Sequence, residues 1–512
     1  MQKELIAVLD FGGQYSHLIT RRIRECEVYS ELVPFATSAQ HLRGLGVKGV
    51  VLSGGPSSVY DEGAPKCDPD VFELQVPVLG ICYGLQLMTL MLGGRVKGTS
   101  RHEYGKTLLQ IKDNSDLFQG MKRSIVSWMS HGDYAETLPN GFETIASSEN
   151  CAAAAIRNPL RHFYGVQFHP EVAHTENGIR IIRNFVLEIC GCAPTWNPRS
   201  IIETSIQQIR AKVGEEGVLT AVSGGVDSTT TAALVQRAVG NRLSCVFVDH
   251  GLLRKGEADR ILRLLKEDLR LDVHFVDASK RFLDRLKGVT DAEEKRKVVG
   301  DEFVRVFDEE SRKLGTCRWL AQGTLYPDVI ESAGTGSPAS RIKSHHNVGG
   351  MPEWSRFQVI EPLRFLYKDE VRKIAKELGL PDSIVKTHPF PGPGLAVRVV
   401  GEATEQKLRI CREASAIVEE VLKRRDLYDS VWQAFAIVGD DEAVGVLGDE
   451  RKLGHIVTVR IVNSIDGMTA DWARVPEDIL EEMSSRITGE VDGVTWVSYV
   501  ITSKPPSTIE PC

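Results

Sequence analysis

The chain has 512 residues, which is too long for a single hydrophobic core and predicts two to four domains. Hydrophobic residues make up 42% of it and charged residues 26%, as in ordinary soluble proteins, and no apolar run approaches the ~20 residues that cross a bilayer. The formal net charge of −7 argues against nucleic-acid binding, which usually needs an excess of basic residues.

Residues 1–190 alternate short apolar runs with helical patterns and predict a first α/β domain. Buried strands are expected at Leu5–Leu9, Gly49–Leu52 and Val76–Ile81, each ending at a glycine-rich or polar turn. This order is typical of a parallel sheet with crossover helices. Residues 157–168 alternate as a hairpin does, so the sheet is expected to be mixed.

A cysteine lies at the expected turn from the third of these strands into a helix, in the segment Gly80-Ile81-Cys82-Tyr83-Gly84. The flanking glycines allow a sharp turn and leave the thiol uncrowded, as in a nucleophile elbow. The unpaired N–H groups of a helix N-terminus stabilise a thiolate. A single cysteine is more often a buried core residue, so the catalytic interpretation needs a base elsewhere in the chain.

The segment Gln167-Phe168-His169-Pro170-Glu171 supplies that base. Pro170 favours an extended backbone at His169, and residues two apart in an extended segment point the same way. Glu171 could therefore orient the imidazole of His169 toward the thiol. Together with the elbow, this favours nucleophilic catalysis by Cys82.

A second α/β domain is expected over residues 196–388, after a linker at Gly191–Pro198 that contains two prolines. Strands are expected at Val218–Val222 and Leu243–Val248, with a helix at Ser228–Val239 between them. The pattern again predicts a largely parallel sheet.

The turn between the first of these strands and the helix has the sequence Ser223-Gly224-Gly225-Val226-Asp227-Ser228. Small residues let backbone N–H groups approach phosphate oxygens at a helix N-terminus. The lysine of a Walker A loop is missing, and the pattern resembles the PP-loop of ATP pyrophosphatases, which cleave between the α- and β-phosphates. Asp227 is then the expected Mg²⁺ contact.

Further polar groups are expected at the same edge of the sheet. Asp249 and His250 follow the strand that ends at Val248, and the segment Gly323–Ser332 adds the carboxylates of Asp328 and Glu331. In open α/β sheets ligands bind at the carboxyl ends of the strands.

The six residues Pro389–Gly394 contain three prolines and two glycines and break the chain's regular structure. Helices near 405–425 and 477–488 and strands at 456–462 and 496–501 follow. The fold class predicted for the whole chain is therefore two consecutive open, largely parallel α/β domains and a small α+β domain over residues 389–512.

The first domain resembles a class I glutamine amidotransferase domain. The resemblance rests on the cysteine and histidine segments, on Ser53-Gly54-Gly55-Pro56 and on Ser130-His131-Gly132-Asp133. It implies a nucleophile Cys82, a base His169, an orienting Glu171, an oxyanion hole from the N–H groups of Gly55 and Tyr83, and glutamine contacts from Gln86 and Asp133.

The chain as a whole resembles the glutamine-hydrolysing GMP synthetase family. The matching segments are Arg341–Gly350, Pro389–Arg398, Asp466–Trp472 and Lys504–Pro506. The resemblance implies that XMP is adenylated at O2 and that ammonia then displaces AMP. The glycines and basic residues of 341–350 favour a mobile lid over the nucleotide rather than a metal site at the adjacent His345 and His346. The resemblance also implies XMP contacts from Arg296, Gln433, Lys504 and Glu510, while Pro511-Cys512 and the acidic residues 440–442 depart from the family pattern.

The expected substrates are ATP, XMP and glutamine, with Mg²⁺ beside ATP and no redox cofactor. A homodimer through residues 389–512 is expected, with no nucleic-acid or membrane partner. The ten cysteines include no C-x-x-C pair, and the N-terminal apolar run is too short and too soon acidic for a signal peptide. A cytoplasmic location is therefore expected.

Three other functions stay open at this stage. The nearest is another PP-loop amidating ligase with a different acceptor, such as a nicotinate nucleotide. A tRNA-modifying PP-loop protein is less consistent with the acidic charge and the complete Cys-His-Glu set. A nucleotide-binding regulator without activity would leave that set unexplained.

Overall fold

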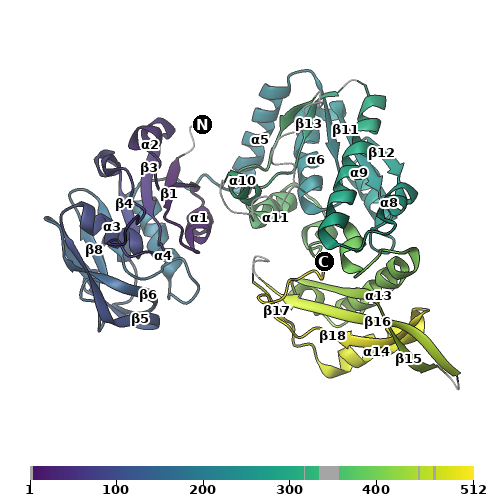
Figure 1. Cartoon of the computed structure of the whole chain (residues 1–512). Coiled ribbons are helices and arrows are strands. Elements are labelled where there is room, and N and C mark those ends of the chain that lie inside the picture. Colours follow the sequence, from purple (N-terminus) through teal and green to yellow (C-terminus); the bar gives the residue numbers. More distant parts are fainter. Residues whose placement is uncertain (1–3, 316, 334–356, 448–449, 465–468) are drawn as a thin grey trace. The chain divides into compact units, whose positions relative to one another are not determined.

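The computed structural model describes residues 4–315, 317–333, 357–447, 450–464 and 469–512. The chain divides into two compact units, Met1–Ser200 and Ile201–Cys512 (Figure 1). Within the described residues, no helix combines the length and the apolar character needed to cross a membrane.

A nine-stranded mixed sheet forms the centre of the first unit, in the order β2-β1-β3-β4-β9-β8-β7-β5-β6. The strands from β2 to β9 pair in parallel, and those from β9 to β6 pair antiparallel, so the expected mixed sheet is confirmed. The strands are β1 Leu5–Asp10, β2 Tyr29–Pro34, β3 Val47–Leu52, β4 Val78–Ile81, β5 Arg95–Ile111, β6 Ser124–Thr137, β7 Glu143–Ser147, β8 Ala155–Asn158 and β9 Phe163–Val166.

Helices cover both faces of this sheet. Leu5, Ala7 and Leu9 of β1 belong to one apolar cluster, and Ile6 and Val8 belong to another. Alternate residues of a strand point to opposite faces, so the strand is buried on both sides and its sequence is continuously apolar. The helices of this unit are α1 Ser16–Glu25, α2 Ala39–Leu45, α3 Tyr83–Met91 and α4 Gly178–Arg183.

The expected linker runs along the first unit before α5 (Pro198–Val213) begins. Trp196 packs against Tyr29 with tilted rings whose centroids lie 4.5 Å apart, and its backbone N–H donates to the Glu27 carbonyl. Proline keeps this segment out of regular structure, while the indole fixes it to the unit.

The second unit begins with a five-stranded parallel sheet in the order β12-β11-β10-β13-β14. Its strands are β10 Gly217–Ala221, β11 Leu243–Asp249, β12 Val273–Asp277, β13 Cys317–Ala321 and β14 Gln358–Ile360. Its helices are α6 Val226–Val239, α7 Glu257–Arg263, α8 Ser279–Leu286, α9 Ala292–Lys313, α10 Tyr326–Ala333, α11 Lys368–Glu377 and α12 Asp382–Val385.

The remainder of the second unit is an α+β layer in which β16 pairs with β15, β17 and β18. The elements are α13 Glu405–Arg424, β15 Gln433–Leu447, β16 Glu450–Asn463, β17 Asp471–Trp472, α14 Glu477–Glu490 and β18 Val494–Tyr499. One apolar core joins Leu219 and Val246 of the parallel sheet to Ile410, Val438 and Val494 of this layer. This shared core explains why residues 201–512 form a single compact unit.

Candidate active sites

The Cys82 thiol stands at the turn between β4 and α3. Cys82 has φ 51° and ψ −106°, a backbone conformation that non-glycine residues rarely adopt outside functional turns. Two glycines make the turn possible. A Cβ on Gly84 would lie 2.2 Å from the Leu52 carbonyl oxygen, and one on Gly80 would lie 2.6 Å from the Gly84 backbone. The chain therefore turns as a nucleophile elbow does.

His169 and Glu171 meet beside this thiol. The His169 Nδ1 lies 2.7 Å from Glu171 Oε1, and both side chains are buried. Burial lowers the pKa of His169, but the charge of Glu171 and hydrogen bonds with Cys82 and Glu171 outweigh it and raise that pKa well above the usual value. The raised pKa favours a protonated imidazole next to the thiol, as a general base beside a nucleophile requires.

The residues expected to hold an oxyanion and the glutamine substrate contact one another within the first unit. Tyr83 is the first residue of α3, so its N–H has no acceptor within the helix. Gly55 packs against it, since a Cβ there would lie 3.3 Å from Tyr83 Cγ. Gln86 Nε2 donates to the Asp133 carbonyl at 2.8 Å, and the Ser58 hydroxyl donates to Asp133 Oδ2 at 2.6 Å.

Two further neighbours of the thiol carried no role in the sequence interpretation. Gln167 Nε2 lies 3.7 Å from Cys82 Sγ, and the thiol donates to the Ser130 carbonyl at 3.6 Å. The alternation of 167, 169 and 171 along an extended segment could have indicated Gln167. Nothing in the sequence indicates the Ser130 carbonyl, because it is a backbone group on a distant strand.

The glycine-rich loop follows β10 and leads into α6. The Ser228 hydroxyl accepts from the Ser223 N–H at 3.2 Å and lies 3.1 Å from the Ser223 hydroxyl, which closes the loop on itself. Gly224 has φ +77°, and a Cβ there would lie 2.4 Å from Ile261 of α7. The left-handed backbone and the close approach of Ile261 therefore favour glycine at this position.

Asp227 lies in the first turn of α6 and forms an ion pair with Lys368 at the start of α11. This pair links residues that are 141 positions apart. The other carboxylate oxygen, Oδ1, is buried and has no hydrogen-bond partner in the part of the chain that the structure describes. An unsatisfied buried carboxylate oxygen next to a phosphate loop fits a hard divalent cation.

The other carboxylates expected at this edge have local partners. Asp249 Oδ1 accepts from the Gly251 N–H at 2.8 Å, and Asp328 Oδ2 accepts from the Leu325 N–H at 3.2 Å. The side chain of Glu331 lies outside the described residues. Among the described residues, no group of three or more metal-ligating side chains occurs.

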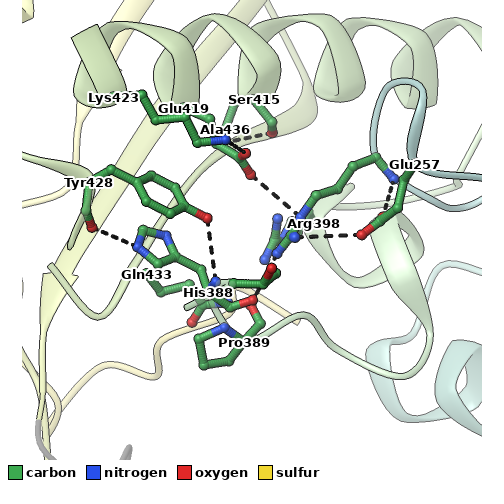
Figure 2. A network of polar contacts seen from close by, with 12 residues as sticks. Glu257, His388, Pro389, Arg398, Ser415, Glu419, Lys423, Tyr428, Gln433 and Ala436 are labelled. Atoms are coloured by element: carbon green, nitrogen blue, oxygen red, sulfur yellow. Dashed lines mark hydrogen bonds and ion pairs between the residues drawn. The ribbon is translucent and has the colours of Figure 1, made fainter. Parts of the chain in front are cut away.

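Two of the four expected XMP contacts, Gln433 and Glu510, meet each other. Figure 2 shows Gln433 beside Pro389 and Arg398. Gln433 Nε2 donates to Glu510 Oε1 at 2.6 Å and to the Pro389 carbonyl at 3.1 Å. Arg398 was not assigned a role from sequence, yet it donates to both Glu510 oxygens at 3.1 Å. Arg398 is only 1% exposed, and its guanidinium lies over the rings of Phe390 and Phe435, 4.9 and 4.1 Å from their centroids.

The other two expected contacts occupy different places. Arg296 on α9 donates to the Cys512 carbonyl, so it lies at the same chain end as Glu510. Lys504 forms a two-way backbone bridge with Ala470, with N···O distances of 2.7 and 3.0 Å. The lid expected over 341–350 lies outside the described residues, as does the segment 466–468 of the family motif.

The fold and the sites define a class. Residues 7–189 match the family described as Glutamine amidotransferase class-I, and residues 420–511 match the GMP synthase C terminal domain. The molecule is thus a class I glutamine amidotransferase joined to an α/β unit with a PP-loop-like turn.

Similar proteins cover the chain from end to end. GMP synthase (glutamine-hydrolyzing) of Thermosynechococcus vestitus is 54% identical, over 100% of this chain and 97% of its own length. Its counterpart in Caldanaerobacter subterraneus is also 54% identical, over 100% and 99%. A crystal structure from Thermoplasma acidophilum, of a shorter protein described as one GMP synthase subunit, is 35% identical over 37% of this chain and 94% of its own, with a TM-score of 0.34. The chain belongs to the glutamine-hydrolysing GMP synthase family.

Proposed function

We propose that this chain makes GMP from XMP, ATP and glutamine through two linked reactions. The first unit releases ammonia from glutamine, and the second unit activates XMP to receive it. The observation that carries the proposal is the coexistence of a Cys82–His169–Glu171 arrangement and a phosphate-binding turn in one chain of this family. Neither a PP-loop ligase for another acceptor nor a tRNA-modifying enzyme is favoured by these full-length relatives.

Glutamine hydrolysis starts at the elbow. His169 takes the proton of Cys82, and the thiolate attacks the side-chain amide carbon of glutamine. The N–H groups of Gly55 and Tyr83 would hold the developing oxyanion. His169 then gives its proton to the leaving nitrogen, ammonia departs, and water hydrolyses the thioester to glutamate, while Glu171 keeps the imidazole oriented.

Gln86 and Asp133 are proposed to bind the glutamine substrate. The Gln86 amide donates to the Asp133 carbonyl and to Gln167, whose own amide donates to the Cys82 thiol. A polar amide and a carboxylate suit the amino-acid end of glutamine, which carries an ammonium and a carboxylate.

Adenylation is assigned to the loop Ser223-Gly224-Gly225-Val226-Asp227-Ser228. Its N–H groups would hold the phosphates of ATP, so that XMP O2 attacks the α-phosphorus and pyrophosphate leaves. Asp227 would hold Mg²⁺, which neutralises charge on the departing pyrophosphate when bound. Mg²⁺ commonly takes one or two protein carboxylates and completes its shell with phosphates and water, which suits Asp227 as one such ligand. Ammonia then attacks C2 of adenyl-XMP, and AMP leaves.

The XMP site is proposed to include Arg296, Gln433, Lys504 and Glu510. The meeting of Gln433 and Glu510 beside the Pro389 loop supports it, because an amide and a carboxylate can pair with a purine edge or ribose hydroxyls. Arg398 would hold Glu510 in place through its two-pronged contact.

A homodimer through residues 389–512 is proposed. Val444, Val446, Leu453 and Trp496 lie on the α+β layer and are 56–70% exposed. Val444 and Leu453 face each other across β15 and β16, and the Trp496 indole donates to the Val444 carbonyl. Large apolar side chains gathered in this way favour a protein contact.

The deciding experiment is a steady-state assay with XMP, ATP, Mg²⁺ and glutamine, scored for GMP. GMP, AMP and pyrophosphate are expected in equal amounts. Pyrophosphate release that needs a different acceptor, such as a nicotinate nucleotide, would overturn the proposal.

A further inference from the structure

Glu103 and His131 form a buried carboxylate–imidazole pair next to the Ser130 carbonyl, which contacts the Cys82 thiol. Glu103 on β5 and His131 on β6 are Cα partners in the antiparallel ladder, and each side chain belongs to a residue only 5% exposed. The register of the two strands shifts between Gly98 and Glu103, and regular pairing resumes at the Glu103–His131 pair.

The hydrogen bonds of His131 require a proton on Nδ1 and a second proton between Nε2 and the Glu103 carboxyl group. Its Nδ1 lies 3.1 Å from the Asp133 carbonyl oxygen, which can only accept, so Nδ1 carries a proton. Its Nε2 lies 3.2 Å from Glu103 Oε2, and this contact needs a proton on one of the two atoms. The pair is therefore bonded through a donor and an acceptor, whichever atom holds the proton.

Glu103 is fixed from its other side as well. The Ser148 hydroxyl lies 2.9 Å from Oε1 and 3.0 Å from Oε2, and it accepts from the Cys151 N–H at 3.0 Å. Ser148 thus positions the Glu103 carboxyl group independently of the contact with His131.

The strand that His131 belongs to forms the wall of the glutamine site. The Ser130 carbonyl accepts from the Cys82 thiol, and the Asp133 carbonyl accepts from both His131 and Gln86. Burial lowers the pKa of His131, the nearby His169 adds to this, and Glu103 opposes both. His131 thus depends on Glu103 to keep a partner at Nε2.

We propose that Glu103 is a positioning residue for glutamine hydrolysis, acting through His131 to hold backbone 130–133 against Cys82 and Gln86. This rests on the proposed function of the first unit. A buried imidazole nitrogen left without its partner would tilt the ring, and the Asp133 carbonyl would lose its place.

Three variants test the proposal. Glu103→Ala removes the partner of His131, and Glu103→Asp shortens that side chain. Glu103→Gln replaces the carboxyl group with an amide that can donate to His131 Nε2 and accept from Ser148. Glu136→Ala is the matched control, because Glu136 lies on β6 of the same hairpin but pairs with Lys97 at the surface. Each is measured by glutamate formation and by GMP formation from ammonium.

Glu103→Ala is expected to raise KM for glutamine roughly tenfold to a hundredfold, the range for an orphaned buried partner. Glu103→Gln should stay within about threefold of the wild type, and Glu103→Asp should behave as Glu103→Ala, which covers the case where the alanine variant does not fold. GMP formation from ammonium should be unchanged in all of them.

The proposal is overturned if Glu103→Ala or Glu103→Asp has a normal KM for glutamine, or if Glu103→Gln is as impaired as Glu103→Ala. It is also overturned if GMP formation from ammonium falls as much as glutamine hydrolysis does. An absence of GMP from ammonium in the wild type would instead refute the proposed synthesis and leave the glutaminase measurement standing.

Discussion

The first unit places polar and ionisable groups in its interior. Cys82, His169 and Glu171 are 6%, 5% and 1% exposed, and the second oxygen of Glu171 has no partner in the described part of the chain. Burying such groups costs free energy unless they are paired, so their burial here is consistent with a functional rather than a stabilising role. Substitutions at these positions are therefore expected to change chemistry more than they change folding.

Cys82→Ala should abolish glutamine as nitrogen donor, with a loss of at least about 10⁴-fold, because no glutamyl thioester can form. Added ammonium should restore GMP synthesis, and higher pH should help, since NH₃ is the nucleophile. The measurement is GMP formation with each nitrogen source. Cys26→Ala is the control, because Cys26 is a buried cysteine away from the elbow. Loss of activity with ammonium as well would contradict the division of labour.

Asp227→Asn should lower GMP formation with glutamine and with ammonium alike, by on the order of 10²-fold, because it removes the charge available to Mg²⁺. Chelation of divalent cations should have the same effect. Glutamate formation is measured in parallel and should continue in both cases. A variant that retains wild-type rates with ammonium would rule out the metal role of Asp227.

His250 gives the second unit a pH-dependent stability. Burial lowers its pKa from the usual value to about 4, and its Nδ1 accepts from the Leu252 N–H. The unfolded chain binds this proton below pH ~6.5 and the folded chain does not, so stability falls as pH falls toward 4. At pH 5 the loss is about 2 kcal/mol, or roughly 4 °C in Tm.

His250→Asn keeps an acceptor for the Leu252 N–H and removes the titration. The variant should show a smaller drop in Tm between pH 7.5 and pH 5 than the wild type. Equal drops in the two proteins would show that His250 does not carry this dependence.

At the scale of elements, the turn between β4 and α3 depends on close backbone approach. Gly80 and Gly84 bring the strand and the helix so near each other that no side chain fits between them. A buried clash with backbone atoms cannot be relieved by rotating a side chain. The elbow is thus set by packing against β3 as much as by its own sequence.

Gly84→Ala should therefore destabilise the first unit by about 1–3 kcal/mol and reduce glutamine hydrolysis, since the new Cβ would meet the Leu52 carbonyl. Gly44→Ala in α2 is the control: nothing lies within 4 Å of its Cβ position, so it should be neutral or stabilising. Thermal unfolding and glutamate formation check both. Equal stability of the two variants would contradict the packing argument.

Periodicity predicted the buried elements well. The strands β1, β3, β10 and β11 and the helices α6, α13 and α14 lie where the apolar patterns indicated. The long β5–β6 hairpin was not predicted, because Gly98 and Gly105 interrupt it and Tyr104 and Leu108 expose apolar side chains on it. Strand patterns are recognisable only where one face is consistently buried.

The same limit applies to the sites. Motifs contiguous in sequence, such as the cysteine elbow and the glycine-rich loop, could be located before the structure. Lys368 and Arg398 could not, because each reaches its carboxylate partner from a position more than a hundred residues away in the chain. Long-range ion pairs leave no local periodicity to detect.

For the whole molecule, the shared core of residues 201–512 implies that the α+β layer does not fold apart from the parallel sheet. The solvent-facing side of the α+β layer stays uncovered. Within the described chain, no element covers its exposed apolar residues Val444, Val446, Leu453 and Trp496. Burying such a surface against a second copy would gain roughly 25 cal/mol for each Å² removed from water.

Leu453→Glu should therefore convert a dimer into a monomer, because it places a charge in the middle of that surface. Light scattering coupled to gel filtration measures the mass. Leu160→Glu is the control, since Leu160 is 92% exposed on the first unit. A Leu453→Glu protein of unchanged mass, or a wild type that is monomeric, would refute the proposed dimer surface.

The ion pair between Asp227 and Lys368 has a consequence for the order in which ligands bind. Without nucleotide, the Lys368 side chain already neutralises Asp227 through Oδ2, so a divalent cation that approaches the open Oδ1 alone meets a repelling positive charge. With the proposed roles of Asp227 and the glycine-rich loop, phosphates would give Lys368 an alternative anion and leave the charge of Asp227 to the metal. Metal and nucleotide would then favour each other's binding, and by linkage each would raise the affinity for the other by the same factor.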